Sequence, residues 1–175
     1  MAAISECVAP FLVRRVGADL LSVQDKDQGY KALLVRAQDL KRSQIAVGIT
    51  EAVGSKQHGK DGLTTILDIA TFHEFGTGTI PERSFLRAWF DENEEQAKVW
   101  VERVTKLIFQ GKLTQARGLA LLGLKFVGEI QERMALGIPP PLALETVWRK
   151  GSSTPLIDTG QLRSSITYVV GEGHE

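Results

Sequence analysis

The sequence predicts an α+β fold in which long helices, a helical hairpin at about 82–136, pack against a small antiparallel sheet. Apolar residues recur at three- and four-residue spacing over 82–110, as in an amphipathic helix, and a second, more uniformly apolar helix is predicted over 114–136. Two short segments, 45–49 and 166–170, are rich in β-branched residues instead. The first of them carries a large apolar side chain at every second position, as a half-buried strand does.

The composition of the chain excludes several classes of protein. Its 175 residues suit one domain, and we expect residues 1–175 to form one. Lys and Arg number 21, as do Asp and Glu, and a formal charge of zero disfavours a dedicated nucleic-acid binder. Cys7 is the only cysteine and cannot form an internal disulfide. With no signal peptide and no long apolar stretch, we expect a soluble protein made in a reducing cytoplasm.

The first third of the chain alternates between short elements and polar breaks. Residues 4–23 fit either one helix face or two short strands, because runs this short show no decisive period. A helix is predicted over 30–41, and the 45–49 strand follows it. Residues 51–62 are rich in glycine and polar side chains, which is typical of a loop. A short helix is predicted over 63–75.

The predicted hairpin occupies the middle of the chain. Its first helix runs from Glu82 to Gln110, with Pro81 at or just before the first turn. Gly111 closes this helix, and Thr114 caps a second one that continues to about Leu136. The short connection makes the two helices antiparallel neighbours.

The last segment carries weaker signals. Residues 144–150 can form a short helix, and Asp158 to Leu162 a helical turn that leads into the 166–170 strand. The tail at 171–175 is expected to fray.

The second helix of the hairpin is apolar on nearly every face. A helix of this kind has to be buried all round, so either the rest of the domain wraps it or other subunits do. Gly118, Gly123 and Gly128 would permit close approach of another backbone. We therefore take this helix as a hypothetical oligomer interface.

The sequence contains no convincing catalytic or metal-binding motif. His73-Glu74 invites a metal or acid–base site, but Thr77 stands where the zinc-protease helix motif needs its second histidine. The short glycine loop at 76–78 is followed by Ile80-Pro81 and not by the Lys-Ser/Thr pair of a phosphate loop. We predict no catalytic residues, no metal site and no bound cofactor, and thus a protein that is not an enzyme.

Two segments, read together, resemble a known family. Residues 73–87, HEFGTGTIPERSFLR, resemble the "EFGT…IPxRxFLR" signature of tail-completion and head–tail connector (neck) proteins of long-tailed bacteriophages. Residues 155–168, PLIDTGQLRSSITY, resemble the "PLIDTGxLRxSIxY" signature of that family and of the related phage virion-morphogenesis family. We call these segments the EFGT motif and the DTG motif. Residues 1–30 match no motif of the family.

The resemblance implies a structural protein of the virion neck or tail, assembled in the host cytoplasm. It would form a ring, a hexamer or a dodecamer, that joins or terminates the tail at the capsid connector. The implied partners are further copies of the chain and neighbouring connector, adaptor, tail-tube or tail-terminator proteins, with DNA passing through the ring lumen. Neither a membrane nor sequence-specific nucleic acid is implied. Zero net charge suits a subunit that stacks against identical copies.

The resemblance also singles out residues with scaffold or assembly roles. Phe75 is expected to pack and Gly76 to reverse the chain, while Arg83 and Arg87, one turn apart, can pair with a carboxylate across an interface. Asp158 is expected to cap the turn that follows it. The motif residues are Glu74, Phe75, Gly76, Thr77, Pro81, Arg83, Phe85, Leu86, Arg87, Leu156, Asp158, Thr159, Gly160, Leu162 and Arg163.

Two other hypotheses remain open at this point. The chain could be a phage-encoded, non-enzymatic interaction domain of the same fold that binds a single phage or host partner. It could also be an enzyme whose site the motifs do not reveal. Convergence of His73 and Glu74 with other polar groups in one pocket would favour the enzyme, and oligomeric state separates the other two.

Overall fold

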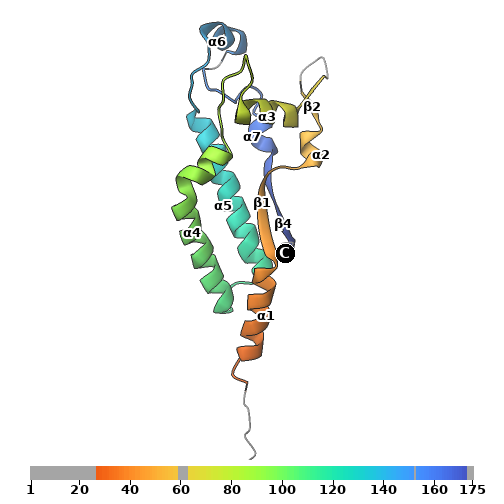
Figure 1. Cartoon of the computed structure of the whole chain (residues 1–175), viewed down its shortest axis with the longest axis vertical. Coiled ribbons are helices and arrows are strands. Elements are labelled where there is room, and N and C mark those ends of the chain that lie inside the picture. The colour runs from red at the N-terminus through yellow and green to blue at the C-terminus, as the bar shows by residue number, and fades with distance from the viewer. Residues whose placement is uncertain (1–26, 59–62, 152, 173–175) are drawn as a thin grey trace, which may run out of the picture.

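A computed structural model of the chain describes residues 27–58, 63–151 and 153–172. Figure 1 shows an elongated molecule with a long helical hairpin on one side and a two-stranded sheet beside it. Shorter helices gather at one end, and α1 (Tyr30–Lys41) extends from the other. The predicted α+β class, long helices packed on a small antiparallel sheet, is confirmed. The alternatives for residues 4–23 lie outside the described residues.

The hairpin is built from α4 (Arg87–Phe109) and α5 (Gln115–Leu136). As predicted, the Thr114 side chain caps α5, where it accepts a hydrogen bond from the Arg117 N–H at 3.4 Å. The first helix starts five residues later than the predicted Glu82, for a reason given with the site below. It also bends at Asn93, whose φ of −116° and ψ of 16° are not helical and whose side chain donates to the Trp89 carbonyl.

The main sheet pairs β1 (Ser43–Ile49) with β4 (Ile166–Glu172) in antiparallel register over seven residues. Residues 171 and 172 were expected to fray, but they pair with Gln44 and Ser43, so that prediction is wrong for both. Residues 173–175 lie outside the described residues. The tail is ordered this far because β1 supplies a strand for the whole length of β4.

Helix α5 covers one face of this sheet, and Gly123 makes the close packing feasible. A Cβ at position 123 would lie 2.3 Å from Cδ2 of Tyr168 on β4, so only glycine fits beneath the ring. Gly118 serves the hairpin similarly, because a Cβ there would lie 2.7 Å from Cδ1 of Ile108. Two of the three glycines assigned to an oligomer interface therefore bring elements of one chain together.

The segment 51–62, predicted as a loop, holds regular structure in its described part. Helix α2 (Glu51–Gly54) is followed by β2 (Gln57–His58), which pairs with β3 (Thr64–Thr65). Gly54 is buried, and a Cβ there would lie 3.2 Å from side-chain atoms of Ile49 and Leu67. The prediction missed these elements because contacts with neighbouring segments stabilise them, while the local composition favours a loop.

Helix α3 (Ile66–Phe75) is shorter than predicted because Thr64 and Thr65 belong to the strand pair. A capping box starts it: the Asp68 carboxylate accepts from the Thr65 N–H at 2.9 Å, and Thr65 Oγ1 accepts from the Asp68 N–H at 3.2 Å. The remaining elements are α6 (Leu144–Lys150) and α7 (Gln161–Ser165). Both lie at the same end of the molecule as α3 (Figure 1).

The core runs between the hairpin, the sheet and α3. The rings of Trp89, Trp100 and Phe126 form its aromatic centre, with Trp89 and Phe126 centroids 5.7 Å apart in an edge-on arrangement. Leu121 and Leu124 of α5 nevertheless stay exposed, so the described residues do not wrap this helix completely. Across the described ranges, no helix combines the length and apolarity that crossing a membrane requires.

Candidate functional site

The EFGT motif is organised around the buried carboxylate of Glu74, which is 6% exposed. One oxygen accepts from the Ser84 hydroxyl at 2.6 Å and the Arg87 N–H at 2.8 Å. The other accepts from the N–H groups of Phe85 and Leu86 at 2.9 and 3.1 Å. The last residues of α3 thus supply the cap of α4 across a loop, satisfying N–H groups that a helix start leaves unpaired.

This cap sets the charge state of Glu74 and the start of α4. Burial alone would raise the pKa of Glu74, but the hydrogen bonds from Ser84 and from three backbone N–H groups outweigh it and lower the pKa below its ordinary value. Residues 81–86 stay outside any helix, and Ser84, Phe85 and Leu86 of this segment donate to Glu74, which is why the helix does not begin after Pro81. Pro81 is exposed and lies six residues before Arg87, so the prediction that it stands at or just before the first helical turn is wrong.

Arg83 is a structural residue and not an interface residue. It is 4% exposed, and its guanidinium donates to the Pro140 carbonyl at 2.8 Å and the Pro141 carbonyl at 3.2 Å. Its backbone N–H donates to the carbonyl of His73 at 2.7 Å. The expectation that Arg83 pairs with a carboxylate across an interface is therefore wrong, because the chain's own proline turn occupies it.

Arg87 and Phe75 lie together on the surface beside this cap. The Arg87 guanidinium pairs with Glu82 and stacks over the Phe75 ring, 5.5 Å from its centroid. Phe75 is 63% exposed, so it does not pack into the core as expected. Phe85 instead is fully buried, and Leu86 packs beside the same core, as predicted.

A tight turn follows α3. Gly76 has a φ of +72°, as its predicted role in reversing the chain requires, and a Cβ there would lie 3.0 Å from the backbone nitrogen of Glu82. Thr77 closes the turn with its side chain, whose Oγ1 accepts from the Ile80 N–H at 3.0 Å. These bonds fix the distance between Glu74 and the start of α4.

The DTG motif forms a second turn that packs against α3 through α7. Gly160 has a φ of +75° and occupies the N-cap position of α7 without a side-chain cap. Asp158 therefore does not cap this helix, and Thr159 Oγ1 instead accepts from the Gln161 N–H at 3.3 Å. Leu162 is buried, whereas the Arg163 side chain is exposed and its carbonyl accepts from Gln131 of α5 at 3.1 Å.

Leu156 holds an unusual backbone conformation in this turn. Its φ of +63° lies in the left-handed region, which costs a non-glycine residue roughly 1–2 kcal/mol. Its side chain is buried in the core cluster, and this packing offsets the cost. The contacts of the buried Leu156 side chain therefore hold the turn in a backbone conformation that would be unfavourable in isolation.

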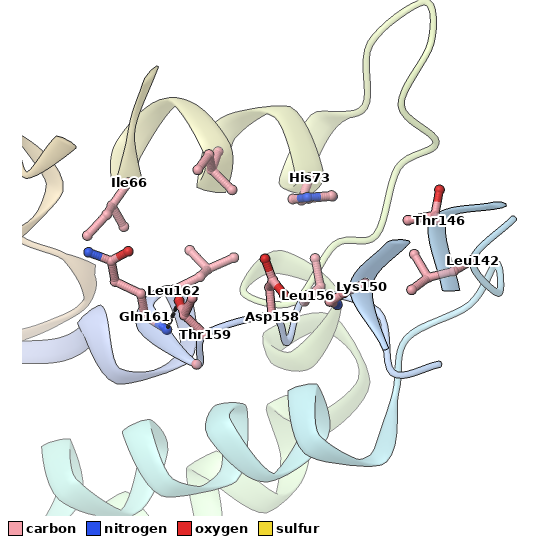
Figure 2. A pocket seen from close by; sticks show the side chains of 12 residues that line it. Ile66, His73, Leu142, Thr146, Lys150, Leu156, Asp158, Thr159, Gln161 and Leu162 are labelled. Carbon is pink, nitrogen blue, oxygen red and sulfur yellow. Dashed lines mark hydrogen bonds between the residues drawn. The ribbon is translucent and has the colours of Figure 1, made fainter. Parts of the chain in front are cut away.

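Helix α3 and the DTG motif face each other across a cavity of about 580 Å³ (Figure 2). His73 of α3 lies on one side, and Asp158 lies opposite on the DTG motif, with Lys150 of α6 beside it. Apolar side chains such as Leu156 and Leu162 complete the lining. Asp158, which sequence reasoning assigned to a cap, therefore contributes its carboxylate to the cavity wall.

The cavity lowers the pKa of both of its basic groups. For His73, burial is the main cause, and the positive charges of Arg83 and Lys150 add to it. Burial also lowers the pKa of Lys150, although the nearby Asp158 carboxylate acts in the opposite direction. Within the described part of the chain, His73 Nδ1 is buried with no hydrogen-bond partner. Lys150 Nζ donates to the Thr154 carbonyl at 2.8 Å.

His73 and Glu74 do not form a joint chemical site. The His73 side chain faces the cavity, while the Glu74 carboxylate is fully engaged in capping α4 and is absent from the lining. Over residues 27–58, 63–151 and 153–172, no group of three or more His, Cys, Asp or Glu side chains could hold a metal ion. Adjacent positions on a helix point in different directions, which separates the two side chains.

Comparison with known proteins finds no match to this chain, whether among protein families, curated proteins or solved structures. The geometry of the site therefore has to carry the functional conclusion together with the motif resemblance.

Sequence reasoning missed several partners of the motif residues. Ser84, the Pro140 and Pro141 carbonyls and Lys150 were not singled out, although each contacts a motif residue or lines the cavity. The one available signal was that Ser84 lies inside the EFGT motif. Pro140 and Pro141 are more than fifty residues from Arg83 in sequence. Lys150 precedes the DTG motif by five residues, but no local pattern links it to His73.

Proposed function

We propose that this chain is a structural, non-enzymatic virion protein of the head–tail junction that works as a ring of identical subunits joining or terminating the tail at the capsid connector. Two lines support the proposal. The EFGT and DTG motifs resemble those of neck and tail-completion proteins, and their residues act here as scaffold: a helix cap, a buried arginine and two tight turns.

The observation that carries the assembly role is the number of large apolar side chains left exposed on the chain. Trp148 of α6 is 84% exposed, and similar residues lie on α1, α3 and α5. Leu144 and Trp148 lie one turn apart on α6 and are both exposed, and contiguous apolar side chains of this kind mark surfaces that other chains cover. The exposed residues with more than half of their surface accessible include Tyr30, Val35, Leu63, Phe75, Leu124, Leu136, Leu144 and Trp148.

The proposal is tested first on the purified chain. Mass photometry and negative-stain electron microscopy should show rings of six or twelve copies, alone or on addition of tail tubes. A strict monomer at micromolar concentration in both conditions would contradict ring formation. A stable dimer that is absent from virions would favour the single-partner interaction domain instead.

The second test is genetic. Deleting the gene from the phage that encodes the chain should leave DNA-filled heads and free tails that do not join, as seen by electron microscopy. Electron microscopy of intact virions should place density for this chain at the neck or tail end. Normal virion assembly by the deletion phage would overturn the proposal.

A further inference from the structure

Within residues 27–58, 63–151 and 153–172, no strand covers either outer edge of the β1–β4 sheet. Among these residues, each edge therefore presents backbone N–H and C=O groups over seven residues. Single-chain proteins blunt such edges with lysine, proline or bulges. Here β1 contains no charged residue and no proline, and Glu172 at the end of β4 is the sheet's one charged residue.

The face of the sheet turned away from α5 is also free of charge. Side chains alternate along a strand, so residues between those packed on the core point to the opposite face. Ala46 and Val169, partners in the register, are exposed there. Figure 1 shows the sheet on the side of α5 opposite α4. A two-stranded sheet with open edges gains stability when further strands extend it.

We propose, on the basis of the ring assembly proposed above, that the β4 edge of one subunit pairs with the β1 edge of the next, so that strands continue as one antiparallel sheet around the assembly. The two strands are equal in length and antiparallel, so each added copy repeats the same alternation. Pairing unlike edges is a heterologous contact, which generates a closed ring when the rotation closes.

Charges at the strand ends fit this contact. Arg42 precedes β1 and Glu51 follows it by two residues, while Arg163 precedes β4 and Glu172 ends it; all four are exposed. Antiparallel pairing of β4 with a neighbouring β1 brings Glu172 to the Arg42 end and Arg163 to the Glu51 end. Both junctions then join opposite charges, and they repeat the charge matching that the β1–β4 register already makes within one chain.

Pairing of unlike edges is favoured because it leaves the fewest strand edges open. Pairing β1 with β1 of a second copy would also match these charges, but it would leave both β4 edges open. Pairing β4 with β1 covers every edge of a closed ring with a single repeated contact. Each open edge is therefore occupied by a second copy of this chain, and the same β4–β1 contact repeats from one copy to the next.

The contact is tested by crosslinking full-length chains in which Cys7→Ser removes the native thiol. Ala46→Cys and Val169→Cys are made in separate chains, which are co-expressed with different tags and treated with a short bifunctional thiol reagent. Both positions are exposed, so the substitutions leave the core intact. We expect a crosslinked product joining the two variants, at most a trace for either variant alone, and none between Ala46→Cys and the exposed control Glu95→Cys on α4.

Four results would overturn the inference. Efficient crosslinking of Ala46→Cys to itself would show symmetric β1 pairing. In a chain that keeps Cys7, an intramolecular crosslink between Cys7 and Ala46→Cys would assign the edge to residues 1–26. Rings without the mixed product would reject the sheet contact while leaving the proposed function in place, whereas a strict monomer would reject both.

Discussion

The Glu74 carboxylate accepts the backbone N–H of Arg87, the first residue of α4, at 2.8 Å. This bond joins the last turn of α3 to the first turn of α4, the longest helix among the described residues, across the loop 76–86, and it fixes where that helix starts. The negative charge also lies at the positive end of the α4 dipole, where it is stabilising. The EFGT motif thus fixes the start of α4 against the end of α3.

Replacing the capping carboxylate should destabilise the fold. Glu74→Gln keeps the size of the side chain, but its amide NH₂ faces backbone donors that need acceptors, so we expect a loss of about 2–4 kcal/mol in the free energy of unfolding. Urea denaturation measures this, with the exposed Glu145→Gln as a control that should change little. Equal stabilities for the two variants would refute the capping role.

The same substitution should flatten the acid dependence of stability. The folded pKa of Glu74 is lowered, so the unfolded chain binds the proton more readily and the contribution is complete only above the unfolded pKa. It is lost as the pH falls through the folded pKa. Unfolding free energies from neutral pH to about pH 3 should fall less steeply in Glu74→Gln than in the native chain.

The two arginines of the EFGT motif should respond differently to lysine. Arg83→Lys loses the planar fork that reaches both proline carbonyls, so we expect a loss of about 1–3 kcal/mol in unfolding free energy. Arg87→Lys keeps an exposed charge and should stay within about 0.5 kcal/mol of the native chain. Thermal denaturation of both variants measures the two losses of stability. Equally small losses would contradict the buried role of Arg83.

The exposed Arg87 offers a test of assembly without loss of folding. Arg87→Glu reverses the charge beside Phe75 and Glu82, so we expect a folded subunit that forms rings poorly. Circular dichroism checks the fold, and mass photometry checks the ring. If particles carrying Arg87→Glu fill and join tails normally, this surface is not an interface.

Two glycines of α5 should give opposite effects on stability. Gly123→Ala places a methyl group against the Tyr168 ring and should cost about 1–3 kcal/mol of unfolding free energy. Gly128→Ala meets no atom within 4 Å and should stabilise the helix by up to ~1 kcal/mol, because alanine is the better helix former. Chemical denaturation of the pair checks this, and a loss at position 128 equal to that at 123 would contradict the packing.

The cavity histidine should titrate below its ordinary pKa. Burial and the charges of Arg83 and Lys150 lower the pKa of His73, so the folded chain binds this proton less readily than the unfolded chain. Its contribution to stability is complete above the unfolded pKa and is lost as the pH falls through the folded one. NMR titration, assigned with His73→Gln, should place the midpoint below about 6.5, and a midpoint above that value would contradict the burial.

The elements with strong periodicity could be predicted from local sequence. The helix over 30–41 and the start of α5 after Thr114 lie where the pattern and the cap place them. Gly76 has the positive φ that its place after a helix suggests. Each of these features depends on residues within a few positions of one another, so a local pattern contains the information.

The candidate site depended on distant contacts that no local pattern contains. Asp158 looked like a cap beside Gly160, but the fold turns its carboxylate to the cavity shared with His73. Arg83 was expected to pair with a carboxylate across an interface, but it is buried against a proline turn more than fifty residues away. The roles of these charged groups followed from which partners the packed chain supplied.

By itself, the sequence determined the class of fold, the hairpin, and the two motifs with their turns, since periodicity, caps and glycine positions are local properties. The tertiary structure alone decided the start of α4, the burial of Arg83 and the cavity between α3 and the DTG motif. Burying a carboxylate or a guanidinium is costly unless its hydrogen bonds are met. The groups that meet them here, backbone donors of a loop and carbonyls of a remote turn, come together only once the chain has folded.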